Sequence, residues 1–177
     1  ILTQQLRHRK LDVIISFGKK TPEDAIPIGA LPIRWIGNNN KAIAQQQPLP
    51  LLLFEAPCLF RSTGLTALEK VKRKWRPALT SGSVAGTWAA AQAGLGITIR
   101  TEMGLPPGCI ALASSSGLPP LPDIEVYMLT HKKTPPPAVK RLTSILHETI
   151  AMQLQEIRMK SRKHGERSRK AKSKKLL

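Results

Sequence analysis

Apolar residues occur in short runs separated by turn residues, and these runs predict several strands. Leu11–Ser16 is continuous and rich in β-branched residues, which is typical of a buried parallel strand. Leu31–Ile36 predicts another strand, which Pro32 confines to a sheet edge or a strand end. Leu51–Phe54 predicts a buried strand, and Asp123–Thr130 alternates apolar and polar residues as a half-exposed strand does.

Helix-like periodicity separates the predicted strands, so the pattern as a whole indicates an α/β fold. Ser62 or Thr63 is expected to cap one helix, and Val84–Ala93 predicts a helix of small residues that can lie close to a sheet. Pro135–Pro137 opens a final helix. Its predicted apolar face consists of Val139, Leu142, Ile145, Leu146, Ile150, Leu154 and Ile157.

The stretch Ala78–Glu102 predicts a strand, a turn, a helix, a second turn and a strand. Its polar cluster, Ser81–Gly82–Ser83, falls where the carboxyl end of a strand meets a helix N-terminus, which is the usual ligand position in open α/β sheets. Short hydroxyls and backbone N–H groups at such a terminus bind carboxylates well. The alternative is that Ser81 or Ser83 only caps the helix.

A length of 177 residues allows one domain or two small lobes. The net charge is +17, and the tail from Arg158 to Leu177 holds ten Lys and Arg residues but one Glu. This tail is expected to be a frayed helix end or disordered. It would attract DNA or RNA without sequence preference, or it is a solvated tail without a partner.

Composition and motifs exclude several classes of function. No apolar run reaches the ~20 residues that span a bilayer, and the basic opening resembles no signal peptide, so a cytoplasmic protein is expected. The four histidines are scattered, which speaks against a metal site. Neither a catalytic constellation nor a dinucleotide or Walker motif occurs, so we expect no enzyme and no cofactor. Cys58 and Cys109 are read as buried and inert, with thiol-based sensing as the alternative.

Several motifs occur in an order that resembles the effector-binding domain of LysR-type transcriptional regulators. They are LDVII, PLPLLLFEAPCLFR, TSGSVAGTWAAAQAGLGITIR, LPPLPDIEVYML and PPPAVKRLTSIL, of which AGLGIT is the most specific. The resemblance implies the two-lobe, type-2 periplasmic-binding-protein fold, with an incomplete first lobe. The expected boundaries are 1–47 with 123–157 for lobe one, 48–122 for lobe two, and 158–177 for the tail.

The resemblance further implies that a small, anionic effector binds between the lobes. The expected effector-binding residues are Ser16, Phe17, Phe60, Arg61, Ser81, Gly82, Ser83 and Arg100. Arg61 and Arg100 would bind the anion by charge-assisted hydrogen bonds. The alternative is that each is an ordinary surface arginine. The intact protein is expected to be a homo-dimer or tetramer that contacts DNA through a helix-turn-helix domain absent from this chain.

Two other readings stay open at this point. The same fold serves solute-binding proteins of transporters, which ordinarily carry a signal sequence and an acidic or neutral body. A nucleic-acid-associated protein acting through the basic tail is the other.

Overall fold

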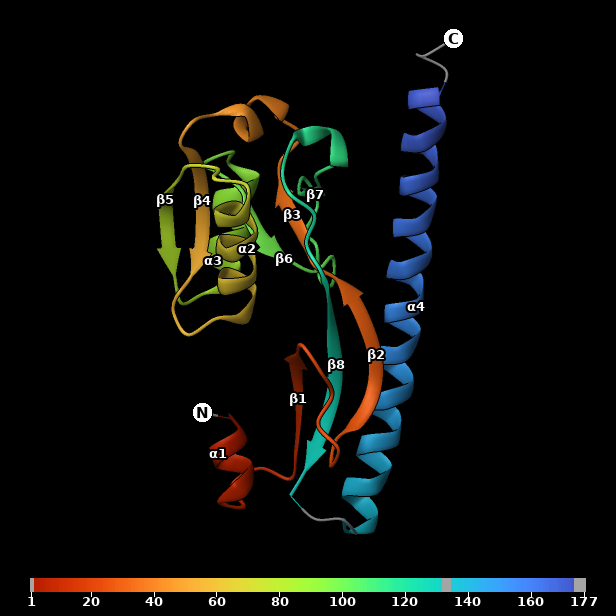
Figure 1. Ribbon diagram of the computed structural model, residues 1–177. Coiled ribbons are helices and arrows are strands. Elements are labelled where there is room, and N and C mark those ends of the chain that lie inside the picture. Colours follow the sequence, from red (N-terminus) through yellow and green to blue (C-terminus); the bar gives the residue numbers. More distant parts are fainter. Residues whose placement is uncertain (1, 132–134, 174–177) are drawn as a thin grey trace. The chain divides into compact units, whose positions relative to one another are not determined.

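The computed structural model describes residues 2–131 and 135–173, with residues 160–173 described by their backbone alone. The chain divides into two compact units, Ile1–Leu31 with Asp123–Leu177, and Pro32–Pro122. Each unit contains its own strands and helices (Figure 1). Residues 32–47, which the sequence analysis assigns to the first lobe, belong to the second unit.

The first unit is a three-stranded sheet in the order β1-β8-β2, accompanied by two helices. Its elements are α1 (Leu2–Arg7), β1 (Val13–Gly18), β2 (Ile26–Pro32), β8 (Asp123–Thr130) and α4 (Pro137–Ser173). The prediction of a buried parallel strand at the start of the chain is wrong. β1 pairs antiparallel with β8, and only Ile14 of its residues is fully buried, because the strand that returns from residues 123–130 supplies its partner.

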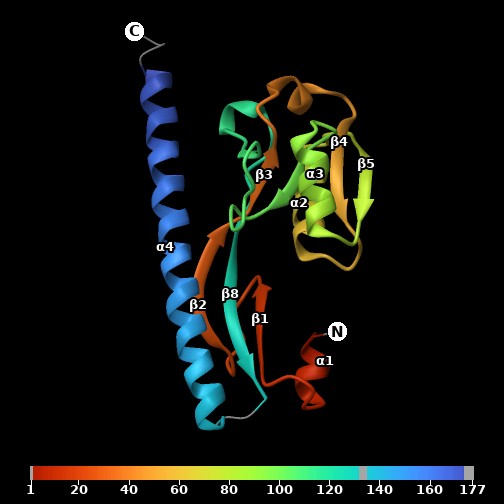
Figure 2. The ribbon, with the colours of Figure 1, turned by 180° about the vertical axis from the view of Figure 1, so that it is seen from behind.

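Helix α4 is 37 residues long and lies along β2 in both views (Figure 1 and Figure 2). The basic tail, which was expected to be a frayed helix end or disordered, continues helix α4 as far as Ser173. Residues 174–177 lie outside the described part. Leu154 is buried and packs against Gly29 of β2. The predicted apolar face is only partly correct, because Leu142 and Ile145 are 48% and 46% exposed. Within the described residues, none of the helices has the length and apolarity needed to cross a membrane.

The second unit combines a parallel pair of strands with a small antiparallel sheet. Its strands are β3 (Arg34–Gly37), β4 (Leu49–Phe54), β5 (Trp75–Ser81), β6 (Thr98–Arg100) and β7 (Ile110–Ala111), and its helices are η1 (Lys41–Gln45), α2 (Leu59–Lys70), α3 (Val84–Gln92) and η2 (Ser114–Ser116). β4 pairs parallel with β5, and β3 lies between β6 and β7. Ile97 joins the two sheets, since its N–H donates to the Pro50 carbonyl at 3.0 Å and its carbonyl accepts from the Leu52 N–H at 2.9 Å.

Helices α2 and α3 cover opposite faces of this unit. Ala90 and Ala91 of α3 pack with Ile36 of β3, whereas Gly64 of α2 lies against Ile99, the cross-strand partner of Trp35. Because neighbouring strand residues point to opposite faces, Trp35 and Ile36 mark the two sides. The predicted helix of small residues thus packs close to the sheet as expected.

The start of α2 differs from the sequence-based prediction. The helix begins at Leu59 with Cys58 at the N-cap position, where no side-chain hydrogen bond is made. Ser62, expected to be the cap, lies in the first turn and donates its hydroxyl to the Leu59 carbonyl at 2.9 Å. The hydroxyl therefore bonds backward to a helix carbonyl instead of capping an N–H group.

Replacing Gly96 by Ala should destabilise the protein, because the added Cβ would lie 2.7 Å from the Pro50 carbonyl oxygen. Overpacking of a well-packed site costs about 1–3 kcal/mol. Gly37→Ala is the matched control, since its added Cβ would lie at least 3.6 Å from its neighbours, an ordinary contact distance. Urea denaturation monitored by circular dichroism compares the two. A Gly96→Ala variant as stable as Gly37→Ala would contradict this close backbone approach.

Candidate functional site

The carboxyl ends of β4 and β5 form one edge of the second unit. Their register aligns Phe54 with Ser81, so the two strands end level with each other. Each strand is followed by a helix, which begins at Leu59 in one case and at Val84 in the other. The first N–H groups of both helices lack intrahelical partners and carry partial positive charge. The arrangement is a common setting for an anionic ligand.

Two arginines converge on Phe54. The Nη1 of Arg61 donates to the Phe54 carbonyl at 3.2 Å. The guanidinium of Arg100 lies 5.2 Å from the ring centroid of Phe54 and 5.5 Å from that of Phe60, both within the range of a cation–π interaction. Burial lowers the pKa of Arg100, and the electrostatic interaction with the nearby Cys58 opposes that shift. The structure thus brings three predicted site residues, Phe60, Arg61 and Arg100, close to Phe54. Phe54 was not among the predicted site residues.

The serine loop is held by its own hydrogen bonds. The Ser83 hydroxyl accepts from the Gly86 N–H at 3.3 Å and so caps α3, as the alternative interpretation proposed. The Ser81 hydroxyl accepts from the Ser83 N–H at 3.0 Å and donates to the Ser83 carbonyl at 3.3 Å. Both hydroxyls therefore have partners within the loop, and the groups best placed for an incoming anion are the backbone N–H groups of the first turn of α3.

A carboxylate lies beside the same loop. A Cβ placed on Gly82 would be 3.0 Å from Oε2 and 3.4 Å from Oε1 of Glu55, and the Glu55 N–H donates to the Ser81 carbonyl at 3.2 Å. Glu55 was not among the predicted site residues, although its position directly after β4 was the available signal. Because Glu55 carries negative charge, it opposes an anion near the serine loop and shifts the favourable region toward the two arginines.

A cavity of about 390 Å³ opens at the start of α2. Cys58, Arg61, Ser62 and Leu65 line it, together with the segment that follows Glu55. Its size falls within the range of small-molecule sites. The cavity therefore offers a place where a ligand could meet Arg61 and the first turn of α2 together.

The remaining predicted residues belong to the first unit. Ser16 and Phe17 lie on β1, opposite Tyr127 and Val126 of β8. Both are half-buried.

Metal and thiol chemistry receive no support from the described residues. Among them, no group of three or more His, Cys, Asp or Glu side chains could hold a metal ion. Cys58 and Cys109 are free thiols, and Cys109 is buried next to α3. Burial also raises the pKa of the Cys109 thiol, which disfavours the reactive thiolate.

Comparison with known proteins identifies related sequences. The family model for the LysR substrate binding domain matches residues 2–151. The HTH-type transcriptional regulator PecT of Dickeya dadantii (strain 3937) is 25% identical over 127 residues, which cover 72% of this chain and 40% of PecT. The HTH-type transcriptional regulator DgdR of Burkholderia cepacia is 30% identical over 135 residues, or 76% of this chain and 46% of DgdR. The chain thus spans less than half the length of these curated relatives.

Solved structures show the same fold. The bromide-bound regulatory domain of HypT from Salmonella typhimurium matches with a TM-score of 0.66 at 16% identity, covering 86% of this chain and 78% of that chain. The reduced regulatory domain of OxyR2 from Vibrio vulnificus matches with a TM-score of 0.60 at 16% identity, covering 85% and 76%. These likenesses confirm the expected α/β, type-2 periplasmic-binding-protein-like fold.

Ser83→Ala should lower the free energy of unfolding by about 1 kcal/mol, because it removes the N-cap of α3. Ser83→Asp should retain the stability of the unsubstituted protein, since an aspartate caps equally well and its charge suits a helix N-terminus. Chemical denaturation of the two variants measures the difference. Equal stability of Ser83→Ala and Ser83→Asp would show that the cap contributes little.

Iodoacetamide at pH 8 should modify Cys58 much faster than Cys109. Cys58 is partly exposed, whereas Cys109 is 5% exposed and its raised pKa leaves less thiolate at this pH. Peptide mass spectrometry after timed quenching measures both rates. Under denaturing conditions the two rates should become similar, and faster modification of Cys109 in the folded protein would contradict its burial.

Proposed function

The chain belongs to the LysR substrate binding domain family, and on this premise we propose that it is the effector-sensing part of a LysR-type transcriptional regulator. The family is that of transcription regulators, in agreement with the expectation that the chain is not an enzyme. The curated relatives also favour a regulator over a transporter's solute-binding protein or a protein that acts only through its basic tail.

The convergence of Arg61 and Arg100 on Phe54, beside two helix N-termini, is the observation that carries the proposed ligand class. Guanidinium groups form strong, paired hydrogen bonds with carboxylates. A small carboxylate is therefore the proposed effector, with Arg61 and Arg100 as its cationic contacts. Phe60 supplies an apolar wall, and the Ser81–Gly82–Ser83 loop lies against the effector beside the first turn of α3, whose backbone N–H groups are the donors.

Ser16 and Phe17 are proposed to contact the same effector from the first lobe. An effector that touches both lobes would favour one of their arrangements, because a ligand shifts an equilibrium by its difference in affinity for the two states. We keep the lobe boundaries expected from the sequence as a proposal, 1–47 with 123–157 for lobe one and 48–122 for lobe two, while residues 32–47 pack with the second compact unit.

The rest of the function concerns the whole protein, because the matched part of this chain covers only 40% of PecT and 46% of DgdR. We propose that it acts in the cytoplasm as a homo-dimer or tetramer. DNA would be contacted through a helix-turn-helix domain, since both relatives are HTH-type regulators and Vibrio fischeri DarR, with a TM-score of 0.63 to this chain, was solved in complex with DNA. Effector binding would then change how that domain meets its DNA.

The proposal predicts that a carboxylate raises the melting temperature of the protein, since a ligand that binds only the folded state stabilises it. Acetate, pyruvate, succinate and benzoate at millimolar concentration are suitable probes in a thermal denaturation series. Arg61→Gln should weaken binding of an active probe about tenfold or more, because a charged hydrogen bond contributes about 1.5–3 kcal/mol. Ser83→Asp should weaken it as well, because the new carboxylate repels the probe while preserving the cap.

Arg76→Gln is the matched control, since it removes the same charge from an exposed position at the other end of β5. It should leave binding unchanged. A folded protein that no probe stabilises, or equal weakening by Arg61→Gln and Arg76→Gln, would contradict the proposed site.

A further inference from the structure

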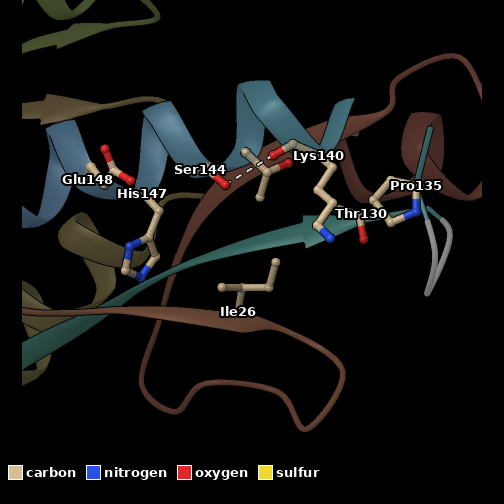
Figure 3. Close-up of a pocket in the computed structure, with 8 residues that line it drawn as sticks. Ile26, Thr130, Pro135, Lys140, Ser144, His147 and Glu148 are labelled. Atoms are coloured by element: carbon tan, nitrogen blue, oxygen red, sulfur yellow. Dashed lines mark hydrogen bonds between the residues drawn. The ribbon is translucent and has the colours of Figure 1, made fainter. Parts of the chain in front are cut away.

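The first unit contains a cavity of about 440 Å³ between α4 and the sheet, separate from the residues considered so far. Ile26 at the start of β2 and Thr130 at the end of β8 line it from the sheet, and Pro135 closes one end (Figure 3). The cavity size is typical of small-molecule sites.

A row of polar residues on α4 lines one side of this cavity. Lys140, Thr143, Ser144, His147 and Glu148 line the cavity, and their spacing of three and four residues places them on one face of α4. Leu142 and Ile145 of the same turns are 48% and 46% exposed. Val139, Leu146 and Ile150 are half-buried and Leu154 is buried, so part of the apolar stripe of α4 packs on the sheet beside this polar row. Since polar side chains make up most of its lining, the cavity suits contents that are themselves polar.

Hydrogen bonds of the lining residues determine which donors and acceptors a ligand in the cavity would meet. The Thr143 hydroxyl donates to the Val139 carbonyl at 2.8 Å, and the Ser144 hydroxyl donates to the Lys140 carbonyl at 3.3 Å. Both hydroxyl protons are therefore engaged, whereas the hydroxyl oxygens of Thr143 and Ser144 can still accept hydrogen bonds. Nε2 of His147 lies 3.1 Å from the Pro27 carbonyl oxygen, which can only accept, so this nitrogen donates.

The cavity wall thus has a cationic donor at one end and acceptors further along the helix. Lys140 supplies a full positive charge and three donors, while the Ser144 hydroxyl oxygen and the Glu148 carboxylate supply acceptors. Seven residues from Lys140 to His147 correspond to about 10 Å of helix. Ile26 offers an apolar surface between the two ends (Figure 3).

We propose that this cavity is a second ligand site, which takes a linear amino carboxylate. The carboxylate of the ligand pairs with Lys140, its methylene chain lies over Ile26, and its ammonium donates to Ser144 and Glu148. The site lies wholly in the first unit and does not depend on the effector proposed for the arginines of the second unit.

Isothermal titration calorimetry of the full chain with 6-aminohexanoate tests the proposal, with hexanoate and hexylamine as probes that each lack one charged end. The amino carboxylate should bind, and each single-ended probe should bind at least about tenfold more weakly, since every charged contact contributes about 1.5–3 kcal/mol. No binding of 6-aminohexanoate, or equal binding of all three probes, would overturn the site.

Lys140→Gln should weaken binding of 6-aminohexanoate about tenfold or more. Arg141→Gln is the matched control, because it removes the same charge from the neighbouring exposed residue, which does not line the cavity. It should bind as the unsubstituted chain does, and so should Arg61→Gln in the second unit, which separates this site from the proposed effector site. Equal affinities of Lys140→Gln and Arg141→Gln would overturn the assignment, provided that circular dichroism shows both to be folded.

Discussion

The candidate effector site depends on the backbone hydrogen bonds that join β5, β4 and Ile97. The parallel register that sets Phe54 opposite Ser81 makes both strands end at one level, and each following helix therefore begins at the same edge. Ile97 can bond to Pro50 and Leu52 only because Gly96 approaches the Pro50 carbonyl more closely than any side chain would allow. The AGLGIT motif is thus a packing requirement as well as a family signature.

The charges at this edge are arranged unevenly. Arg61 is tethered to the Phe54 carbonyl, and Arg100 is held by two aromatic rings, so both guanidinium groups are positioned before any ligand arrives. Glu55 places a negative charge beside Gly82 at the same edge. An anion would therefore bind with its charge toward the arginines, and a donor group on the same ligand would suit Glu55. A ligand at the proposed site would therefore be selected by its orientation as well as by its charge.

Local signals predicted much of the fold, and contacts between distant residues account for what was missed. Asp123–Thr130 and the helix from Val84 follow from periodicity, because each element contains its own pattern. Periodicity does not show which strand pairs with which, however, and the antiparallel pairing of β1 with β8 joins residues more than 100 positions apart. The same limit applies to the site, where Arg100 was expected to contact an anion but no local pattern places its guanidinium over Phe54 and Phe60.

Helix α4 shows this limit most clearly. Its sequence carries two stripes at helical spacing, one apolar with Leu142 and Ile145 and one polar with Lys140, Ser144 and His147. A hydrophobic stripe normally faces a core, so the sequence alone favours the apolar one. In the structure, Leu142 and Ile145 are exposed, whereas Val139, Leu146 and Ile150 are half-buried and Leu154 is buried against Gly29, so only part of the broad apolar stripe faces the sheet. The polar row lines the cavity beside Ile26 and Thr130. Which part of a broad apolar stripe meets the sheet depends on tertiary contacts such as that of Leu154 with Gly29, which periodicity does not contain.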